Sequence, residues 1–138
     1  MATSNDAGLG IRKVISSSFP EALARVTTAL AAQGFGILSD IDVAATLQNR
    51  IGKTIEPYRI LGACNPNLAY EALSVDRNIG LLLPCNVVVR QVGPNEVEVN
   101  IANPDAIFGL APAEAAAQIP DLPAEARELL EAALASLE

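Results

Sequence analysis

Two apolar runs decide the fold of this chain: Ile60-Leu61-Gly62-Ala63-Cys64-Asn65-Pro66 and, after a short polar segment, Gly80-Leu81-Leu82-Leu83-Pro84-Cys85-Asn86-Val87-Val88-Val89. Runs of this length and composition are typical of buried β-strands. Each run holds one of the two cysteines of the chain, beside a proline and an asparagine. Proline and asparagine favour turns and helix starts, so each thiol is expected where a strand meets a turn or a helix.

Outward from these runs, the spacing of apolar residues predicts five strands. They are expected at residues 9–16, 35–41, 58–64, 84–92 and 96–102, and the apolar run that leads into the fourth begins at Leu81. The last two flank the turn Gly93-Pro94-Asn95 and read as a β-hairpin. The final arm alternates, which predicts one buried face and one solvent-exposed face: Val97, Val99 and Ile101 on the first, Glu96, Glu98 and Asn100 on the second.

Capping signals predict three helices between these strands. Ser18 precedes a helix that runs to about residue 34, Asp42 precedes one at 43–51, and Asn65 precedes one at 67–74. Serine, aspartate and asparagine are favoured there because their side-chain oxygens accept hydrogen bonds from the free amides of the first helical turn.

The two ends of the chain differ in pattern. The C-terminal segment, residues 104–138, is expected to be helical, and its last part carries one apolar stripe at helical spacing: Ala126, Leu129, Leu130, Ala133, Leu134 and Leu137. Residues 1–7 show no such pattern and are expected to lack regular structure. No linker divides the chain, so residues 1–138 are expected to form one domain.

Composition excludes several classes of function. The net charge of −7 is the wrong sign for gripping nucleic-acid phosphates. No run approaches the roughly 18 apolar residues of a membrane span, so no membrane association is expected. The N-terminus lacks the pattern of a secretory signal, which makes the cytoplasm the expected location and reduced thiols the expected state. The chain has no histidine, which removes Ser-His-Asp and Cys-His catalysis and most zinc sites.

At this point the residues carry a resemblance to a known family. The segments Gly34–Gly36, Pro57–Pro66 and Leu82–Val89, with Asp40 and Asp42 between the first two, resemble the bacterial and archaeal domain of unknown function 302 family over residues 10–104. The resemblance implies an α+β fold: a two-layer sandwich with a curved, mainly antiparallel sheet and helices on one face, similar in shape to the TATA-binding protein. It also implies a tendency to form homodimers. It implies no activity, cofactor or metal.

The first candidate site is the pair of cysteines with their neighbouring asparagines, Cys64, Asn65, Cys85 and Asn86. A thiol at a helix N-terminus is favoured as the thiolate, the nucleophilic and metal-binding form. Alternatively, both thiols fill small apolar spaces, since free cysteine is among the most buried residue types. Two thiolates are too few ligands for a closed zinc site, so a metal would have to be a two-thiolate ion or bridge two chains.

The second and third candidates are charged. Asp40 and Asp42 could serve acid–base chemistry, or Asp42 could be a helix cap and Asp40 a solvated carboxylate. Tyr58, Arg59 and Arg90 could hold a small anion, although an ion pair with Glu98 on the neighbouring strand explains Arg90 as well.

Two functions follow from these observations. The favoured one is a non-enzymatic homodimer that binds a small ligand or a partner and needs no cofactor. The other is a thiol-dependent protein that handles sulfur, redox equivalents or a soft metal through Cys64 or Cys85. The dimer is expected because the strand at 96–102 is long, regular and free of proline, so its edge would invite a second chain.

Overall fold

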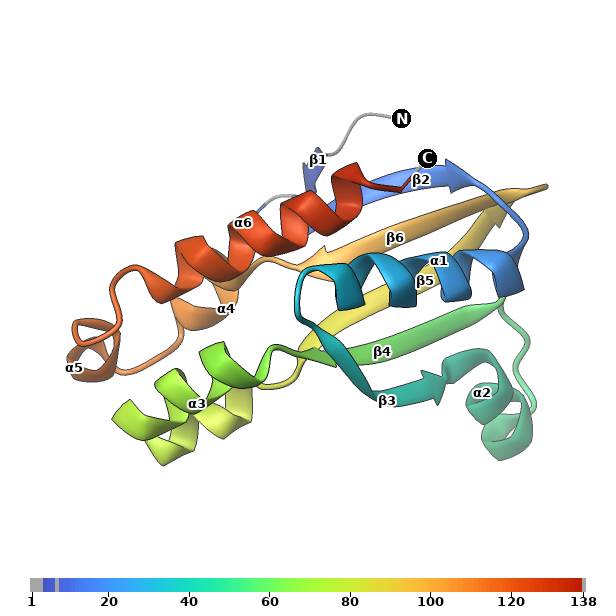
Figure 1. The fold of residues 1–138 in the computed structure, drawn as a ribbon. Helices are drawn as coiled ribbons and strands as arrows, with labels where there is room; N and C mark the ends of the chain where they lie inside the picture. The colour runs from blue at the N-terminus through green and yellow to red at the C-terminus, as the bar shows by residue number, and fades with distance from the viewer. Residues whose placement is uncertain (1–3, 7, 138) are drawn as a thin grey trace.

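The computed structural model describes residues 4–6 and 8–137, which form an α+β fold around one open antiparallel sheet (Figure 1). In the described part of the chain the sheet has six strands, in the order β1-β2-β6-β5-β4-β3. Every neighbouring pair is antiparallel. The strands are β1 (Ser4–Asp6), β2 (Gly10–Ser16), β3 (Gly36–Asp42), β4 (Tyr58–Cys64), β5 (Cys85–Gly93) and β6 (Glu96–Ala102).

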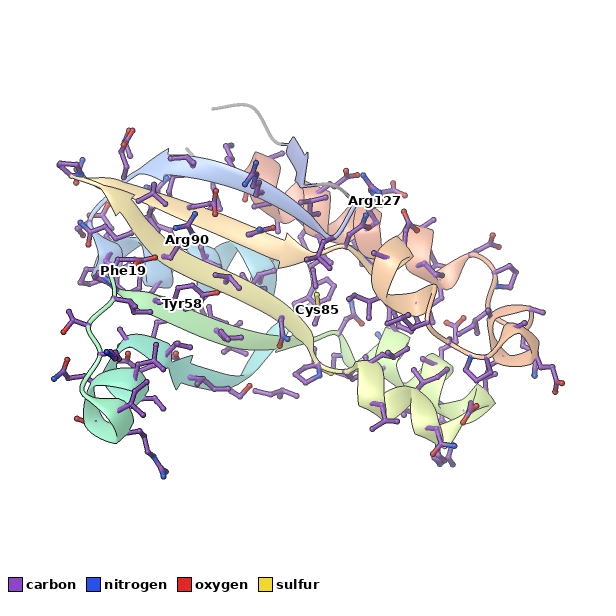
Figure 2. The ribbon with its side chains drawn as sticks, turned by 180° about the vertical axis from the view of Figure 1, so that it is seen from behind. Phe19, Tyr58, Cys85, Arg90 and Arg127 are labelled. Atoms are coloured by element: carbon purple, nitrogen blue, oxygen red, sulfur yellow. The ribbon has the colours of Figure 1, made fainter. Side chains whose placement is uncertain are left out.

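The helices lie mostly on one side of this sheet. They are α1 (Phe19–Ala32), α2 (Val43–Ile51), α3 (Pro66–Val75), the 3₁₀ helix η1 (Arg77–Leu82), α4 (Pro104–Phe108), α5 (Ala113–Ala116) and α6 (Leu122–Ala135). Helices α1 and α6 cover one face, and the view from behind shows the sheet in front of them (Figures 1 and 2). None of the helices in the described residues is long and apolar enough to cross a membrane.

The predicted helix caps are confirmed. The Ser18 hydroxyl accepts a hydrogen bond from the Glu21 amide at 3.3 Å, and the Asp42 carboxylate accepts one from the Ala45 amide at 2.9 Å. Asn65 caps α3 in the same way, through the Leu68 amide. A cap depends on residues three positions apart at most, which is why the sequence alone predicts it.

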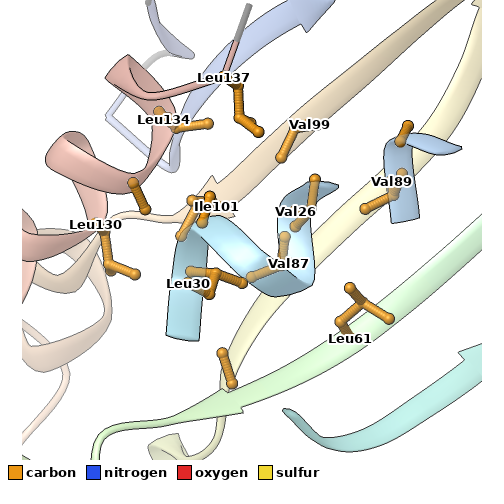
Figure 3. Packing of buried hydrophobic residues seen from close by; sticks show 14 of the residues in the cluster. Val26, Leu30, Leu61, Val87, Val89, Val99, Ile101, Leu130, Leu134 and Leu137 are labelled. Atoms are coloured by element: carbon orange, nitrogen blue, oxygen red, sulfur yellow. The ribbon is translucent and has the colours of Figure 1, made fainter. Parts of the chain in front are cut away.

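The core lies between the sheet and helices α1 and α6 (Figure 3). Alternate residues of the central strands point into it, as the hairpin pattern predicted. The labelled core side chains are Val26 and Leu30 of α1, Leu61 of β4, Val87 and Val89 of β5, Val99 and Ile101 of β6, and Leu130, Leu134 and Leu137 of the C-terminal segment.

Strand β6 lies inside the sheet, so the expectation of an exposed edge at 96–102 is wrong. It pairs with β5 on one side and with β2 on the other, and Val97 lies opposite both Gln91 and Ile15. Strand β2 therefore supplies the partner that the sequence analysis assigned to a second chain. The edge strands of the described sheet are β1 and β3, and β3 pairs with β4 alone.

Glu98 is buried, although the alternation placed it on the solvent-exposed face. It does point away from the core, but only 8% of the residue is exposed. Arg90 of β5 lies 3.2 Å from one carboxylate oxygen and Arg12 of β2 lies 3.6 Å from the other. Burial of a carboxylate is costly without such partners, and the two flanking strands supply them.

Two boundaries also differ from the sequence predictions. Residues 4–6 form β1 through backbone pairing with β2, which needs no side-chain pattern; residues 1–3 and 7 of the predicted irregular segment lie outside the described residues. Strand β5 begins at Cys85, one residue after the predicted start at 84, and the apolar run from Leu81 that leads into it begins in the short helix η1, which Asp76 caps through the Asn78 amide. In the sequence the apolar residues of η1 resemble a strand, because so short an apolar run shows neither the spacing of a helix nor the alternation of a strand.

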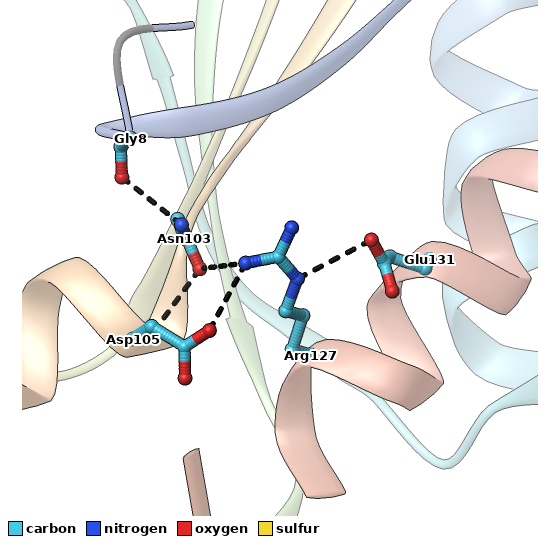
Figure 4. A network of polar contacts seen from close by, with 5 residues as sticks. All are labelled: Gly8, Asn103, Asp105, Arg127 and Glu131. Carbon is cyan, nitrogen blue, oxygen red and sulfur yellow. Dashed lines mark hydrogen bonds and ion pairs between the residues drawn. The ribbon is translucent and has the colours of Figure 1, made fainter. Parts of the chain in front are cut away.

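Polar contacts tie the C-terminal segment to the sheet (Figure 4). The side-chain nitrogen of Asn103 donates to the Gly8 carbonyl at 3.0 Å. The side-chain oxygen of Asn103 accepts from the backbone amide of Asp105 at 3.1 Å and from Arg127 at 3.4 Å. Arg127 of α6 also pairs with Asp105 at 3.0 Å and with Glu131 at 3.3 Å. One buried asparagine thus joins the segment before β2, the start of α4 and the middle of α6.

Candidate functional site

A cavity of about 340 Å³ lies at the end of the sheet where β4 ends and β5 begins. Ala63 and Cys85 are neighbours across these two strands. The chain leaves β4 into α3, returns through η1, and continues after β6 into α4, so helices gather beyond this end of the sheet (Figure 1). Helix α6 crosses from the other side and contributes Ala126 and Leu130. The cavity therefore lies where α3, η1, the α4 region and α6 meet beyond one end of the sheet without filling the space between them.

The lining of the cavity is apolar and uncharged. Its polar members are two thiols and two amide side chains, and none of the described residues that line it carries a charge. The lining residues are Phe35, Ala63, Cys64, Asn65, Leu68, Ala69, Leu81, Leu82, Leu83, Pro84, Cys85, Asn86, Ala102, Pro104, Ile107, Phe108, Leu110, Leu122, Ala126 and Leu130.

The structure brings together one group of candidate residues from the sequence. Cys64, Asn65, Cys85 and Asn86 all line the cavity, although the two pairs lie on different strands. Both cysteines are free. The Asn65 side chain is engaged in capping α3, and the Asn86 side chain is exposed. Across the described residues, no group of three or more metal-ligating side chains comes together, so the two thiols have no third protein ligand there.

The Cys85 thiol is a poor nucleophile in this environment. Its sulfur lies 3.8 Å from the Ala102 carbonyl oxygen, to which it donates, and its side chain points into the fold (Figure 2). Burial raises the pKa of the Cys85 thiol to about 12, well above its ordinary value. At neutral pH the group is therefore the neutral thiol, which behaves as a small hydrophobe rather than as a thiolate.

The raised pKa predicts how Cys85 reacts with alkylating agents. In a Cys64→Ser variant, the rate of iodoacetamide labelling should rise about tenfold per pH unit from pH 7 to pH 10 without levelling, because the thiolate fraction is still growing. In denaturant the same variant should level near pH 8.5, the ordinary value for a free cysteine. A native rate that levels below pH 9 would show a normal thiol and contradict this assignment.

The other candidate residues lie away from this cavity, and the charged ones among them are paired within the chain. Arg59 lies 2.9 Å from a carboxylate oxygen of Asp40 and 3.4 Å from one of Asp42. Asp42 is a helix cap, as expected, and Asp40 is solvent-exposed, as expected, while it also pairs with Arg59. These two acids compete with any anion for the Arg59 guanidinium, so this cluster is less suited to anion binding than the sequence indicated.

Arg90 has the cross-strand partner that the sequence analysis weighed. It contacts Glu98 at 3.2 Å and Glu56 at 3.4 Å. Tyr58 lies opposite Arg90 in the β4–β5 pair, and both labelled side chains lie on the face of the sheet away from α1 (Figure 2). Arg59 follows Tyr58 and so points to the other face. Arg90 and Arg59 therefore lie on opposite faces, although Tyr58 and Arg59 both line a second cavity of about 420 Å³ together with Asp42.

Sequence reasoning missed the apolar residues that complete the cavity. Phe35 immediately precedes β3, Pro104, Ile107, Phe108 and Leu110 come from the region of α4, and Leu122 starts α6. Each of them is indistinguishable from an ordinary core residue in the sequence. Only their convergence on one space marks them, and no local pattern carries that information.

Comparisons with known proteins place the chain in a family. The sequence model described as Domain of unknown function DUF302 matches residues 11–137, which includes the C-terminal segment that the resemblance over 10–104 left out. No curated protein matches the chain significantly. The crystal structure of an uncharacterized conserved protein DUF302 from Bacillus stearothermophilus is similar with a TM-score of 0.81 and 26% identity, over 94% of this chain and 98% of that one. The chain therefore belongs to the family Domain of unknown function DUF302.

Proposed function

We propose that this protein is a non-enzymatic, homodimeric binding domain that holds a small molecule in the cavity between β4, β5, α3, α4 and α6. The cavity is the observation that carries the proposal. Its volume of about 340 Å³ falls within the range of small-molecule sites in proteins, roughly 300 to 1,000 Å³. A few polar groups in a mainly apolar lining are also typical of such sites.

A packing defect is a weaker explanation for a space of this size. Protein interiors are packed as densely as organic crystals, and most internal gaps are no larger than a water molecule. This cavity is about twice the ~150 Å³ engineered cavity that binds benzene in another protein. Part of its apolar lining faces solvent, and covering such surface with an apolar ligand is favourable, which favours an occupant.

Filling the cavity tests the binding function. Ala69 of α3 is half-buried and lines the cavity, so Ala69→Phe should place a ring where a ligand would lie. Amide NMR spectra recorded with a panel of neutral, anionic and cationic small molecules should show shifts at the cavity for the unmodified chain. The variant should weaken binding of any such compound at least about tenfold, because ring and ligand compete for the same volume.

The matched control is Ala31→Phe, which adds the same ring to an exposed position of α1 outside the lining. It should leave binding unchanged. If no compound of the panel shifts the cavity residues, or if Ala69→Phe binds as well as the unmodified chain, the proposed function fails.

The homodimer is proposed to form at strand β3 instead of β6. In the described residues β3 is an edge of the sheet, and it exposes two large apolar side chains, Leu38 at 70% and Ile41 at 51%. An edge strand with exposed apolar residues favours pairing with a second chain, and a two-fold contact of one surface with itself is the commonest assembly.

Sedimentation equilibrium at micromolar concentration measures this assembly. The unmodified chain should give twice the monomer mass of 14.4 kDa, and Leu38→Lys should give the monomer mass, because two-fold symmetry places both introduced charges in one contact. Ile51→Lys changes an exposed residue of α2 and should leave the dimer intact. A monomeric unmodified chain, or a dimer that Leu38→Lys does not weaken, would refute this contact.

A further inference from the structure

Two leucines line the cavity and yet face solvent. Leu81 of η1 is 89% exposed and Leu110, which follows α4, is 76% exposed. We call these two side chains the lip of the cavity. The apolar lining therefore continues outward to the surface on two segments, at Leu81 and at Leu110, which are 29 positions apart in the sequence. Leucines this exposed stabilise the fold very little, since they lose almost no surface to the core.

Among the described residues, the cavity and its lip present no charged side chain to a ligand. No charged side chain of the described residues lines the space, and the chain as a whole carries a net charge of −7, which repels anions. A charge moved from water into such a space loses its hydration without gaining a partner. The Cys85 thiol reports the same environment, because burial raises its pKa to about 12 and so disfavours a negative charge there.

We infer that the ligand is an uncharged, largely apolar molecule, such as an aliphatic chain or a fused ring system, whose outer part lies against Leu81 and Leu110. This inference rests on the proposed function and narrows it to one chemical class. The cavity volume favours a small molecule over a second copy of the chain, because about 340 Å³ holds one compact molecule and no helix or strand. A ligand of this class also accounts for the exposed lip, because a bound apolar molecule would cover both leucines.

The preference for an uncharged ligand is tested with three compounds that share a ten-carbon chain and differ in the charge of the head group. Nile red, a neutral dye that fluoresces in apolar surroundings, is bound to the unmodified protein and displaced by decanol, decanoate or decylamine at neutral pH. Decanol should displace it at a concentration at least about tenfold lower than either charged analogue, because only the charged ends lose hydration without compensation.

The lip is tested with two exposed substitutions. The double variant Leu81→Ser, Leu110→Ser should weaken Nile red and decanol at least about tenfold, since two apolar contacts with the ligand are removed. Leu9→Ser changes a leucine of similar exposure outside both the lining and the proposed dimer contact, and should leave ligand binding unchanged. Equal circular dichroism spectra and unfolding midpoints of all three proteins exclude a folding defect.

Each outcome decides at least one of the two proposals, which are the binding function and the uncharged class of its ligand. If decanoate or decylamine binds in the cavity as tightly as decanol, the binding function stands and the uncharged class is wrong. If the double variant binds Nile red unchanged, or alters only the sedimentation mass, the lip does not contact a small molecule and the inference is overturned. If neither dye nor any ten-carbon compound binds while charged compounds of the NMR panel do, the inference fails and the binding function survives. If nothing binds at all, both fail.

Discussion

Leu134→Ala is expected to lower the free energy of unfolding by about 3 to 5 kcal/mol, the largest effect of any single substitution considered for this chain. Leu134 belongs to α6, is completely buried, and packs in the core cluster shared by α1, α6 and the sheet (Figure 3). Truncation removes apolar contacts and leaves a cavity that the rigid sheet cannot close. Urea denaturation followed by circular dichroism measures the change.

Position 134 carries a second role that strengthens the expectation. The Lys13 ammonium of β2 donates to the carbonyl of Leu134 at 3.1 Å and also to that of Leu137, at the C-terminal end of α6 where cations are favoured. A shifted helix end would weaken these contacts as well. The control is Leu81→Ala, the same chemical change at an 89% exposed residue, which should stay within about 0.5 kcal/mol. Similar losses for both variants would show that α6 is not part of the cooperative core.

Asn103→Ala is expected to cost about 2 to 3 kcal/mol of folding stability, the second largest effect. Asn103 is 3% exposed and caps α4 through the Asp105 amide (Figure 4). Alanine would remove the cap and would leave the Gly8 carbonyl without its side-chain donor. Loss of a buried partner costs the desolvation of the group left behind, which adds to the loss of the cap.

Arg127 lessens this loss without cancelling it, because it keeps its contacts with Asp105 and Glu131 when Asn103 is truncated. The control is Asn49→Ala, which replaces an exposed asparagine within α2 and should be neutral within about 0.5 kcal/mol. Equal unfolding midpoints for Asn103→Ala and the unmodified chain would mean that the asparagine contributes nothing net. Native-state hydrogen exchange should show the loss first at α4, where the cap acts.

The sequence predicted the polar residues of the candidate site but not the apolar residues that complete it. Cys64 and Cys85 attracted attention because rare side chains stand beside turn-forming residues, and both do line the cavity. Their chemistry was not visible, since the pKa of the Cys85 thiol follows from how deeply it is buried. Arg59 and Arg90 looked available for an anion, and each has acidic partners within 3.4 Å that come from other segments.

The local features of this protein follow directly from its amino-acid pattern: the three helix caps, the β5–β6 hairpin, the inward alternation of Val97, Val99 and Ile101, and the amphipathic α6. Each depends on residues within one or two turns or on a fixed side-chain period, so the chain needs no distant contact to specify it. Three other features were found only in the folded chain: β6 lies between β2 and β5, Glu98 is buried between two arginines, and five separate segments line one uncharged cavity. These features depend on which distant segments meet, and that choice is made by the packing of the whole core rather than by any stretch of sequence.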